Sequence, residues 1–206
     1  MKKNILISLI LLITATVVAE KAYGYAEAEQ PLQTSVQPTV TIEKQTASIE
    51  NAVANGKTGT HSGLQSVFNI KTNGNDDNYD FIITSSIPHD GGTVSAYGSN
   101  GSLLFVNTLS SPTSESIENA RIGGDNNRNV IAYPVDISTT SPITADFKQN
   151  YSVYGNCYVI KVNSSDGADG TVTHIVGQTP VQGTYSVGQD QAGTYQATVT
   201  FTAYSK

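Results

Sequence analysis

Three histidines and one cysteine are the side chains best suited to metal binding or nucleophilic chemistry. His61, His89 and His174 lie far apart in the sequence, and Cys157 has no other cysteine with which to pair. Zinc sites take their ligands at short, regular spacings, and these residues show none. A nucleophile elbow and a phosphate-binding glycine loop are also absent from the sequence. We therefore expect no metal, no cofactor and no enzymatic activity, with Cys157 buried as a free thiol.

Two short acidic segments carry oxygen ligands of the kind that calcium prefers. They are Asn73-Gly74-Asn75-Asp76-Asp77-Asn78 and Asp166-Gly167-Ala168-Asp169-Gly170. Neither has the ligand spacing of an EF-hand loop or its distal bidentate glutamate. We interpret both as hydrophilic turns between strands.

Tyrosines are the third group with a chemical role to offer, because an exposed ring can stack on a sugar. The sequence contains no tryptophan, the strongest residue for such a platform, and tyrosines in strands are usually core residues. A secreted carbohydrate-binding or adhesin-like module therefore stands as the alternative function. Its candidate platform is Tyr97, Tyr133, Tyr151, Tyr154 and Tyr158.

The composition indicates which elements position these residues. Of the 206 residues, 38% are hydrophobic and 14% are charged, and leucine does not occur after Leu109. A helical bundle needs far more Ala, Leu, Glu and Lys, so this class is excluded. The formal net charge of −6 argues against a protein that binds nucleic acid through phosphate contacts. A polar chain that forms β-strands remains.

The N-terminus has the pattern of a secretory signal peptide. Lys2 and Lys3 precede an apolar run over residues 5–18, and small residues follow as far as Gly24. A transmembrane anchor is the alternative, but about 18–20 apolar residues are needed to span a bilayer and this run is shorter. We expect residues 1–24 to be removed and the chain to be exported.

Alternating apolar residues and Gly/Asn/Asp turns predict strands along the rest of the chain. We expect an all-β fold, an immunoglobulin-like β-sandwich of about seven to nine strands over residues 44–206. Residues 25–43 form an N-terminal extension and a candidate donor strand. The predicted strands are 36–42, 64–70, 79–85, 93–97, 103–107, 129–137, 151–162, 171–176, 183–187 and 194–204.

The two ends of the mature chain complement each other. Val36, Val40 and Ile42 alternate with polar residues near the N-terminus, and one face of the last strand is apolar. An alternating strand on an extension and a strand with a free edge are the two halves of β-strand addition. The apolar face of the last strand consists of Tyr195, Ala197, Val199, Phe201 and Ala203.

These ends resemble those of pilins from bacterial chaperone–usher fimbriae. Gly193 is fourteenth from the end of the chain, and Tyr204 lies near the terminus. The absence of a disulfide, and the segments 37–42 and 192–195, are similar to class 5 (alpha) fimbrial pilins. Tyr204 is third from the end, whereas these pilins usually place the tyrosine penultimate.

The resemblance implies an incomplete sandwich whose missing strand comes first from a periplasmic chaperone and then from the next subunit. It also implies an outer-membrane usher, and a route through the periplasm to a fimbrium at the cell surface. An ordinary sandwich whose first and last strands pair within one chain is the simpler alternative. The candidate interface residues are Val36, Val40, Ile42, Gly193, Tyr195, Val199, Phe201 and Tyr204.

Overall fold

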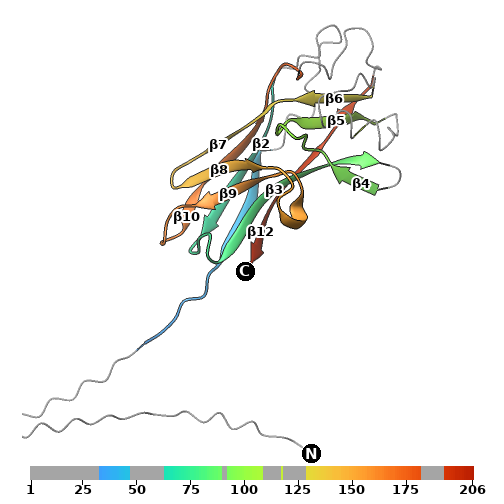
Figure 1. Ribbon diagram of the computed structural model, residues 1–206. Coiled ribbons are helices and arrows are strands. Elements are labelled where there is room, and N and C mark those ends of the chain that lie inside the picture. Colours follow the sequence, from blue (N-terminus) through green and yellow to red (C-terminus); the bar gives the residue numbers. More distant parts are fainter. Residues whose placement is uncertain (1–32, 47–62, 90–91, 109–116, 118–128, 182–192) are drawn as a thin grey trace, which may run out of the picture. The chain divides into compact units, whose positions relative to one another are not determined.

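The computed structural model describes residues 33–46, 63–89, 92–108, 117, 129–181 and 193–206, and these residues are almost entirely β-structure (Figure 1). Nine of the twelve strands are longer than four residues, which agrees with the expected number. The strands are β1 (Val40–Thr46), β2 (Leu64–Thr72), β3 (Tyr79–His89), β4 (Gly92–Ser95), β5 (Leu103–Asn107), β6 (Val130–Tyr133), β7 (Val135–Thr139), β8 (Ile143–Lys148), β9 (Cys157–Val162), β10 (Ala168–Val176), β11 (Tyr195–Gln196) and β12 (Thr198–Ser205).

The strands form two main antiparallel sheets. The first has the order β1-β2-β10-β7, and the second has the order β12-β3-β9-β8, with β4 added to β3. A smaller sheet, β11-β5-β6, contains the remaining described strands. The all-β sandwich predicted from the sequence is confirmed.

A single apolar cluster fills the space between the sheets. Ile70 and Val172 of the first sheet are fully buried, as are Ile83 and Ile160 of the second to within 1%. The rings of Phe68 and Phe201 meet edge-to-face across the sandwich, with their centroids 5.7 Å apart. The apolar residues that alternate along the strands of both sheets are thus the ones that face the core.

A short connection closes one flank of the sandwich. β7 ends at Thr139 in the first sheet, and β8 begins at Ile143 in the second. The backbone N–H of Thr140 donates to Thr171 O (3.1 Å), and that of Ile143 donates to Thr140 O (2.9 Å). The chain therefore passes from one layer to the other along this flank.

Several predicted strands have other bounds in the structure. The first begins at Val40 instead of residue 36. The predicted strand 129–137 is two strands in different sheets, because Pro134 has no N–H for a ladder bond and separates β6 from β7. The predicted strand 183–187 lies outside the described residues, as do residues 47–62 with His61.

The predicted strand 151–162 is wrong in its first half. Residues Ser152–Tyr154 form a 3₁₀ turn, η1, and the strand begins only at Cys157. Asn150 and Ser152 have φ values of 48° and 50°, a left-handed conformation that the alternation of side-chain types does not reveal. Strand β8, just before this turn, was not predicted, although its Ile143, Ala145 and Phe147 alternate with polar residues as in a half-buried strand.

Candidate functional site: an open sheet edge

Strand β12 forms one edge of the second sheet, and within the described residues only β3 pairs with it (Figure 1). The N–H of Lys206 donates to Asn78 O (3.0 Å), which continues the register of β12 with β3. On the other side of β3, Ser85 O accepts from Ala96 N (3.1 Å). Because backbone groups alternate in direction along a strand, the even-numbered residues of β12 bond to β3.

The odd-numbered residues of β12 consequently turn their N–H and C=O groups away from β3. These residues are Val199, Phe201, Ala203 and Ser205, and no described backbone hydrogen bond uses their outward groups. Exposed sheet edges of this kind offer unsatisfied donors and acceptors to any extended chain that approaches. The predicted free edge of the C-terminal strand is therefore present in the described part of the chain.

Strand β1 forms the edge of the opposite sheet on the same flank. The N–H of Asn73 donates to Thr39 O (3.3 Å), so the odd-numbered residues of β1 bond to β2. Val40 and Ile42 turn their backbone groups outward but pack their half-buried side chains against the core. Both sheets therefore stop at this flank, where β1 and β12 lie near each other but no described backbone hydrogen bond joins them. At the β7–β8 flank, by contrast, a short connection joins the two sheets.

The loop 73–78 joins the two edges and sets their directions. Its Asn73 N–H donates to Thr39 O just before β1, and its Asn78 O accepts the N–H of Lys206 just after β12. Since one strand leaves the loop and the other arrives at it, β1 and β12 run in opposite directions. Their partly buried apolar side chains line the flank on either side of Phe201, which is 8% exposed.

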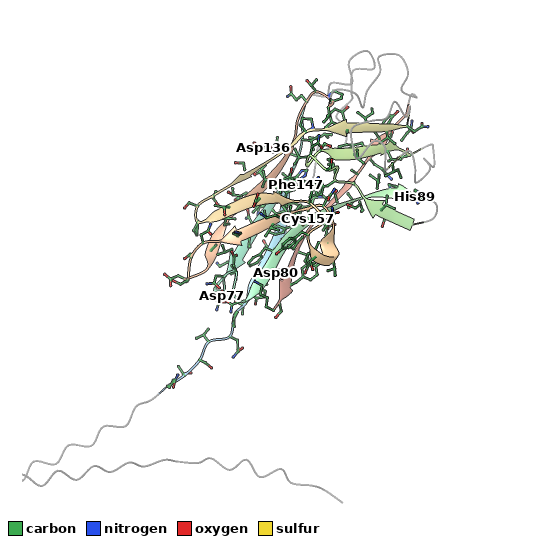
Figure 2. The ribbon with its side chains drawn as sticks, in the orientation of Figure 1. Asp77, Asp80, His89, Asp136, Phe147 and Cys157 are labelled. Carbon is green, nitrogen blue, oxygen red and sulfur yellow. The ribbon has the colours of Figure 1, made fainter. Side chains whose placement is uncertain are left out.

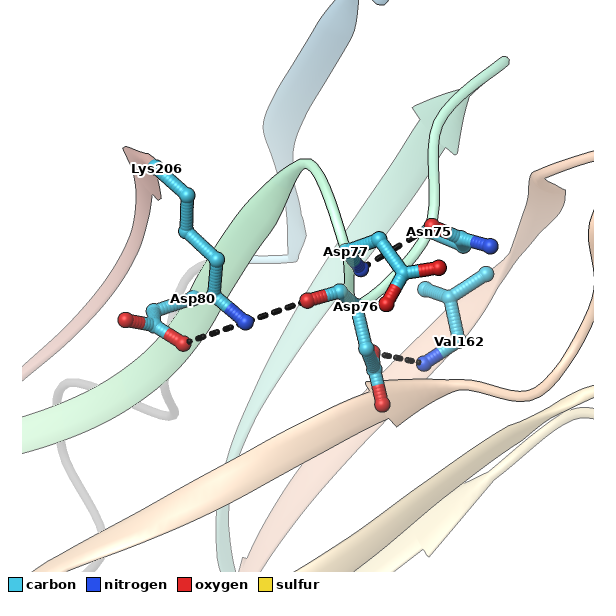
Figure 3. A network of polar contacts seen from close by, with 6 residues as sticks. All are labelled: Asn75, Asp76, Asp77, Asp80, Val162 and Lys206. Atoms are coloured by element: carbon cyan, nitrogen blue, oxygen red, sulfur yellow. Dashed lines mark hydrogen bonds and ion pairs between the residues drawn. The ribbon is translucent and has the colours of Figure 1, made fainter.

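The acidic residues of this loop serve structural hydrogen bonds (Figure 3). Asp76 Oδ1 accepts the N–H of Val162 (2.8 Å), and Asn75 Oδ1 accepts the N–H of Asp77 (3.0 Å). Lys206 Nζ donates to Asp76 O and lies 3.2 Å from Asp80 Oδ1. The described residues contain no group of three or more His, Cys, Asp or Glu side chains placed to hold a metal.

The candidate interface residues from the sequence separate into three groups. Val199 and Phe201 lie on the open edge strand, with Tyr204 at its end. Val40 and Ile42 belong to the chain's own β1, whereas Val36 precedes that strand and is 82% exposed.

Gly193 and Tyr195 form the third group and do not belong to β12. Tyr195 is in β11 and pairs with Asn107 of β5. An added Cβ at Gly193 would come within 2.6 Å of Asn107 Oδ1, so a side chain there has no room. This glycine has a packing role at the third sheet rather than a role at the open edge.

Three of the five candidate sugar-binding tyrosines are core residues. Tyr97, Tyr133 and Tyr158 are 0%, 4% and 7% exposed. The hydroxyl of Tyr97 lies 2.9 Å from His174 Nε2, and that of Tyr158 donates to Gly101 O (3.0 Å). The predicted five-tyrosine platform is therefore wrong.

A different aromatic group lies at the surface. Tyr154 contacts both Tyr151 (centroids 6.1 Å apart) and Tyr204 (5.0 Å). Val153 of the same turn is 87% exposed, and Tyr204 is 41% exposed. The sequence did not reveal this cluster because Tyr204 joins it from β12, 50 residues further along the chain.

Burial makes the titratable groups of the core unreactive. It lowers the pKa of His174 to about 4 and raises that of Tyr158 to about 12. Cys157, labelled in Figure 2, is fully buried and free, and burial also raises the pKa of its thiol. The expected burial of Cys157 is confirmed.

Comparisons with family models, curated proteins and solved structures found no match to this chain. Among the described residues, no helix is long and apolar enough to cross a membrane.

Proposed function

We propose that this protein is an exported structural subunit of a bacterial surface fimbria, assembled by β-strand donation between copies. The observation that supports the proposal best is the open edge of β12. Its outward backbone groups and the half-buried side chains beside it fit an added strand. The donor is the extension that precedes β1 in another copy.

The position of β1 changes the boundary of the donor segment. Val40 and Ile42 pack against the core cluster of their own chain, so they are not available for donation to another copy. The available extension in the mature chain is therefore residues 25–39 rather than 25–43. Val36 is the member of the predicted donor set that remains exposed for a partner.

Strand donation of this kind builds a filament. The donor segment and the acceptor edge are different surfaces, so each contact is heterologous and leaves a free extension or edge for the next copy. An uncovered edge also invites aggregation, which accounts for a periplasmic chaperone and an usher as partners before assembly. We infer these partners from the resemblance of the chain ends to chaperone–usher pilins.

Truncation of the extension tests this function. A chain that lacks residues 25–39 should fold with a melting temperature only slightly lowered, because every described strand remains and only the bonds of Gln37 and Thr39 to the end of β2 and the loop 73–78 are lost. It should stay monomeric in size-exclusion chromatography and electron microscopy while the mature chain forms filaments. The proposal fails if the truncated chain polymerises as well, or if the mature chain does not polymerise under conditions that keep it folded.

The surface tyrosines support a second candidate function, carbohydrate binding. Tyr151, Tyr154 and Tyr204 offer aromatic surface beside the exposed Val153, on a turn held by the bond from Tyr151 N to Gly155 O (2.8 Å). A glycan-array comparison of the native chain with Tyr151→Ala tests it, with Tyr133→Phe as the control outside the cluster. Equal binding of both variants to every glycan contradicts this second function.

A further inference from the structure

We propose a specific register for the donated strand: residues 30–36 of a second copy pair antiparallel with Val199–Ser205 of β12. Val36 then lies opposite Val199, and Gln30 lies opposite Ser205. This inference rests on the proposed function and adds the segment, its direction and its alignment. Four features of the chain support it.

The first feature is the match between side-chain and backbone directions. In β12 the odd-numbered residues direct their free backbone groups away from β3 in the plane of the sheet and, as Val199 and Phe201 show, direct their apolar side chains into the core. Residues directly opposite each other in a sheet share a face. The inward residues of the donor must therefore be the ones that hydrogen-bond to β12. In the segment 30–36, Leu32 and Val36 share the inward face with Gln30 and Thr34, and Pro31, Gln33 and Ser35 share the other.

The second feature is Pro31, which has no N–H to donate. With Leu32 and Val36 facing inward, Pro31 lies opposite Tyr204 in a position where its backbone nitrogen points away from β12. The opposite alternation would place the proline where a ladder bond is required, and would turn Gln33 and Ser35 into the core. Side-chain polarity and proline placement thus select the same alternation independently.

The third feature separates this register from its neighbours. Sliding the donor two residues in one direction places Pro38 opposite Val199, where β12 needs a donor that proline lacks. Sliding it two residues in the other direction places Val36 opposite Ala197, outside β12. The proposed register instead sets Thr34 opposite Phe201 and Leu32 opposite Ala203, so that a small side chain faces each large one.

The fourth feature shows that the donor belongs to a second copy. Asn73 Nδ2 donates to Gln37 O (3.2 Å) and Asn73 N to Thr39 O (3.3 Å), which hold the chain just before β1 at the loop 73–78. Val199 lies six residues from the end of β12 that meets this loop, about 20 Å away at about 3.3 Å per residue. A single peptide unit joins Val36 to Gln37 and spans about 3.8 Å. A chain therefore cannot place its own Val36 opposite its own Val199.

Engineered disulfides test the register. Gln33 and Thr202 are directly opposite in it, at a position without ladder bonds on the outer face, so Gln33→Cys in one copy should cross-link to Thr202→Cys in another. Thr200→Cys and Tyr204→Cys place the partner cysteine two residues before or after position 202, on the same face of β12, and serve as matched controls. Differently tagged copies, each with one engineered cysteine, are co-assembled and oxidised, and filament formation is followed separately by electron microscopy. The buried Cys157 remains in all variants, and the unmodified chain measures its contribution.

We expect the Gln33–Thr202 pair to give at least about tenfold more mixed dimer than either control pair. Filaments that cross-link preferentially through Thr200→Cys or Tyr204→Cys would overturn the register and leave strand donation intact. A monomeric chain carrying both Gln33→Cys and Thr202→Cys that closes an internal disulfide at high dilution would overturn the requirement for a second copy. If none of the variants nor the unmodified chain forms filaments, the proposed function itself fails.

Discussion

Phe201 is the residue that links the open edge to the core. Its ring is 8% exposed and meets Phe68 of the opposite sheet, whereas its neighbour Thr200 is exposed on the outer face. The apolar alternation of the last strand was sufficient to predict which of these side chains turns inward.

Substitutions at these two positions should differ in their cost. Phe201→Ala removes a buried ring and should lower the free energy of unfolding by about 3–5 kcal/mol. Thr200→Ala changes an exposed side chain and should cost about 0.5–1 kcal/mol. Denaturant melts measure both, and equal losses would show that both faces of β12 are buried.

His174 makes the stability of the sandwich sensitive to acid. Its side chain is fully buried and burial lowers its pKa from 6.5 to about 4, so the folded state holds the neutral ring while the unfolded state takes up a proton. Stability should therefore fall as the pH drops from about 6.5 toward 4, by up to about 3 kcal/mol at about 1.4 kcal/mol per pH unit.

Melts of the native chain and of His174→Gln across this pH range check the effect. The glutamine variant should be less stable at neutral pH but should lose less on acidification, because the titrating ring is gone. An identical pH slope in both proteins would assign the acid sensitivity to other groups.

Cys157 should resist alkylation in the folded protein. The thiol is fully buried and burial raises its pKa, so thiolate is scarce and inaccessible at neutral pH. Mass spectrometry after iodoacetamide treatment should show little labelling until denaturant is added. Rapid labelling of the native chain, or a reducible covalent dimer, would contradict this placement.

At the scale of the elements, alternation and apolar runs in the sequence predicted most of the described strands, but they did not lead to β8, whose residues alternate without interruption. The predicted ranges 64–70 and 103–107 match β2 and β5 closely, because Leu64, Phe68 and Ile70 mark the inward face of β2 and residues 103–106 are a continuous apolar run. The same pattern gave a wrong prediction around Tyr151. Residues with left-handed backbone conformation end the extended structure there, although the alternation of side-chain types continues. The order of strands in the sheets, and hence the location of the open flank, depends on long-range pairing that periodicity does not encode.

Strand β1 should behave as part of the sandwich rather than as part of the extension. Removing residues 25–46 deletes β1, uncovers β2 and should lower the melting temperature. Removing only residues 25–39 should lower it much less, because only the bonds of Gln37 and Thr39 to the end of β2 and the loop 73–78 are lost. Thermal melts of the two truncated chains compare them directly, and equal melting temperatures would show that β1 contributes nothing to the fold.

For the whole molecule, the account gives each copy one extension that it cannot use itself and one edge that it cannot complete. The sequence predicted both ends as the interacting parts, from the alternation around Val36 and along β12. It did not predict that Val40 and Ile42 pack against the core of their own chain. A strand that pairs within its own chain and a strand that is donated to another copy show the same alternation of side chains.

Backbone hydrogen exchange at the open edge tests this account most directly. The measurement uses the chain without residues 25–39, before and after addition of a synthetic peptide of those residues. We expect the amides of Val199, Phe201, Ala203 and Ser205 to exchange rapidly in the free protein and to become protected with the peptide, while the amides of Thr200 and Thr202 are protected throughout by β3. Protection of the four odd-numbered amides in the free protein, or no change on peptide addition, would contradict the account.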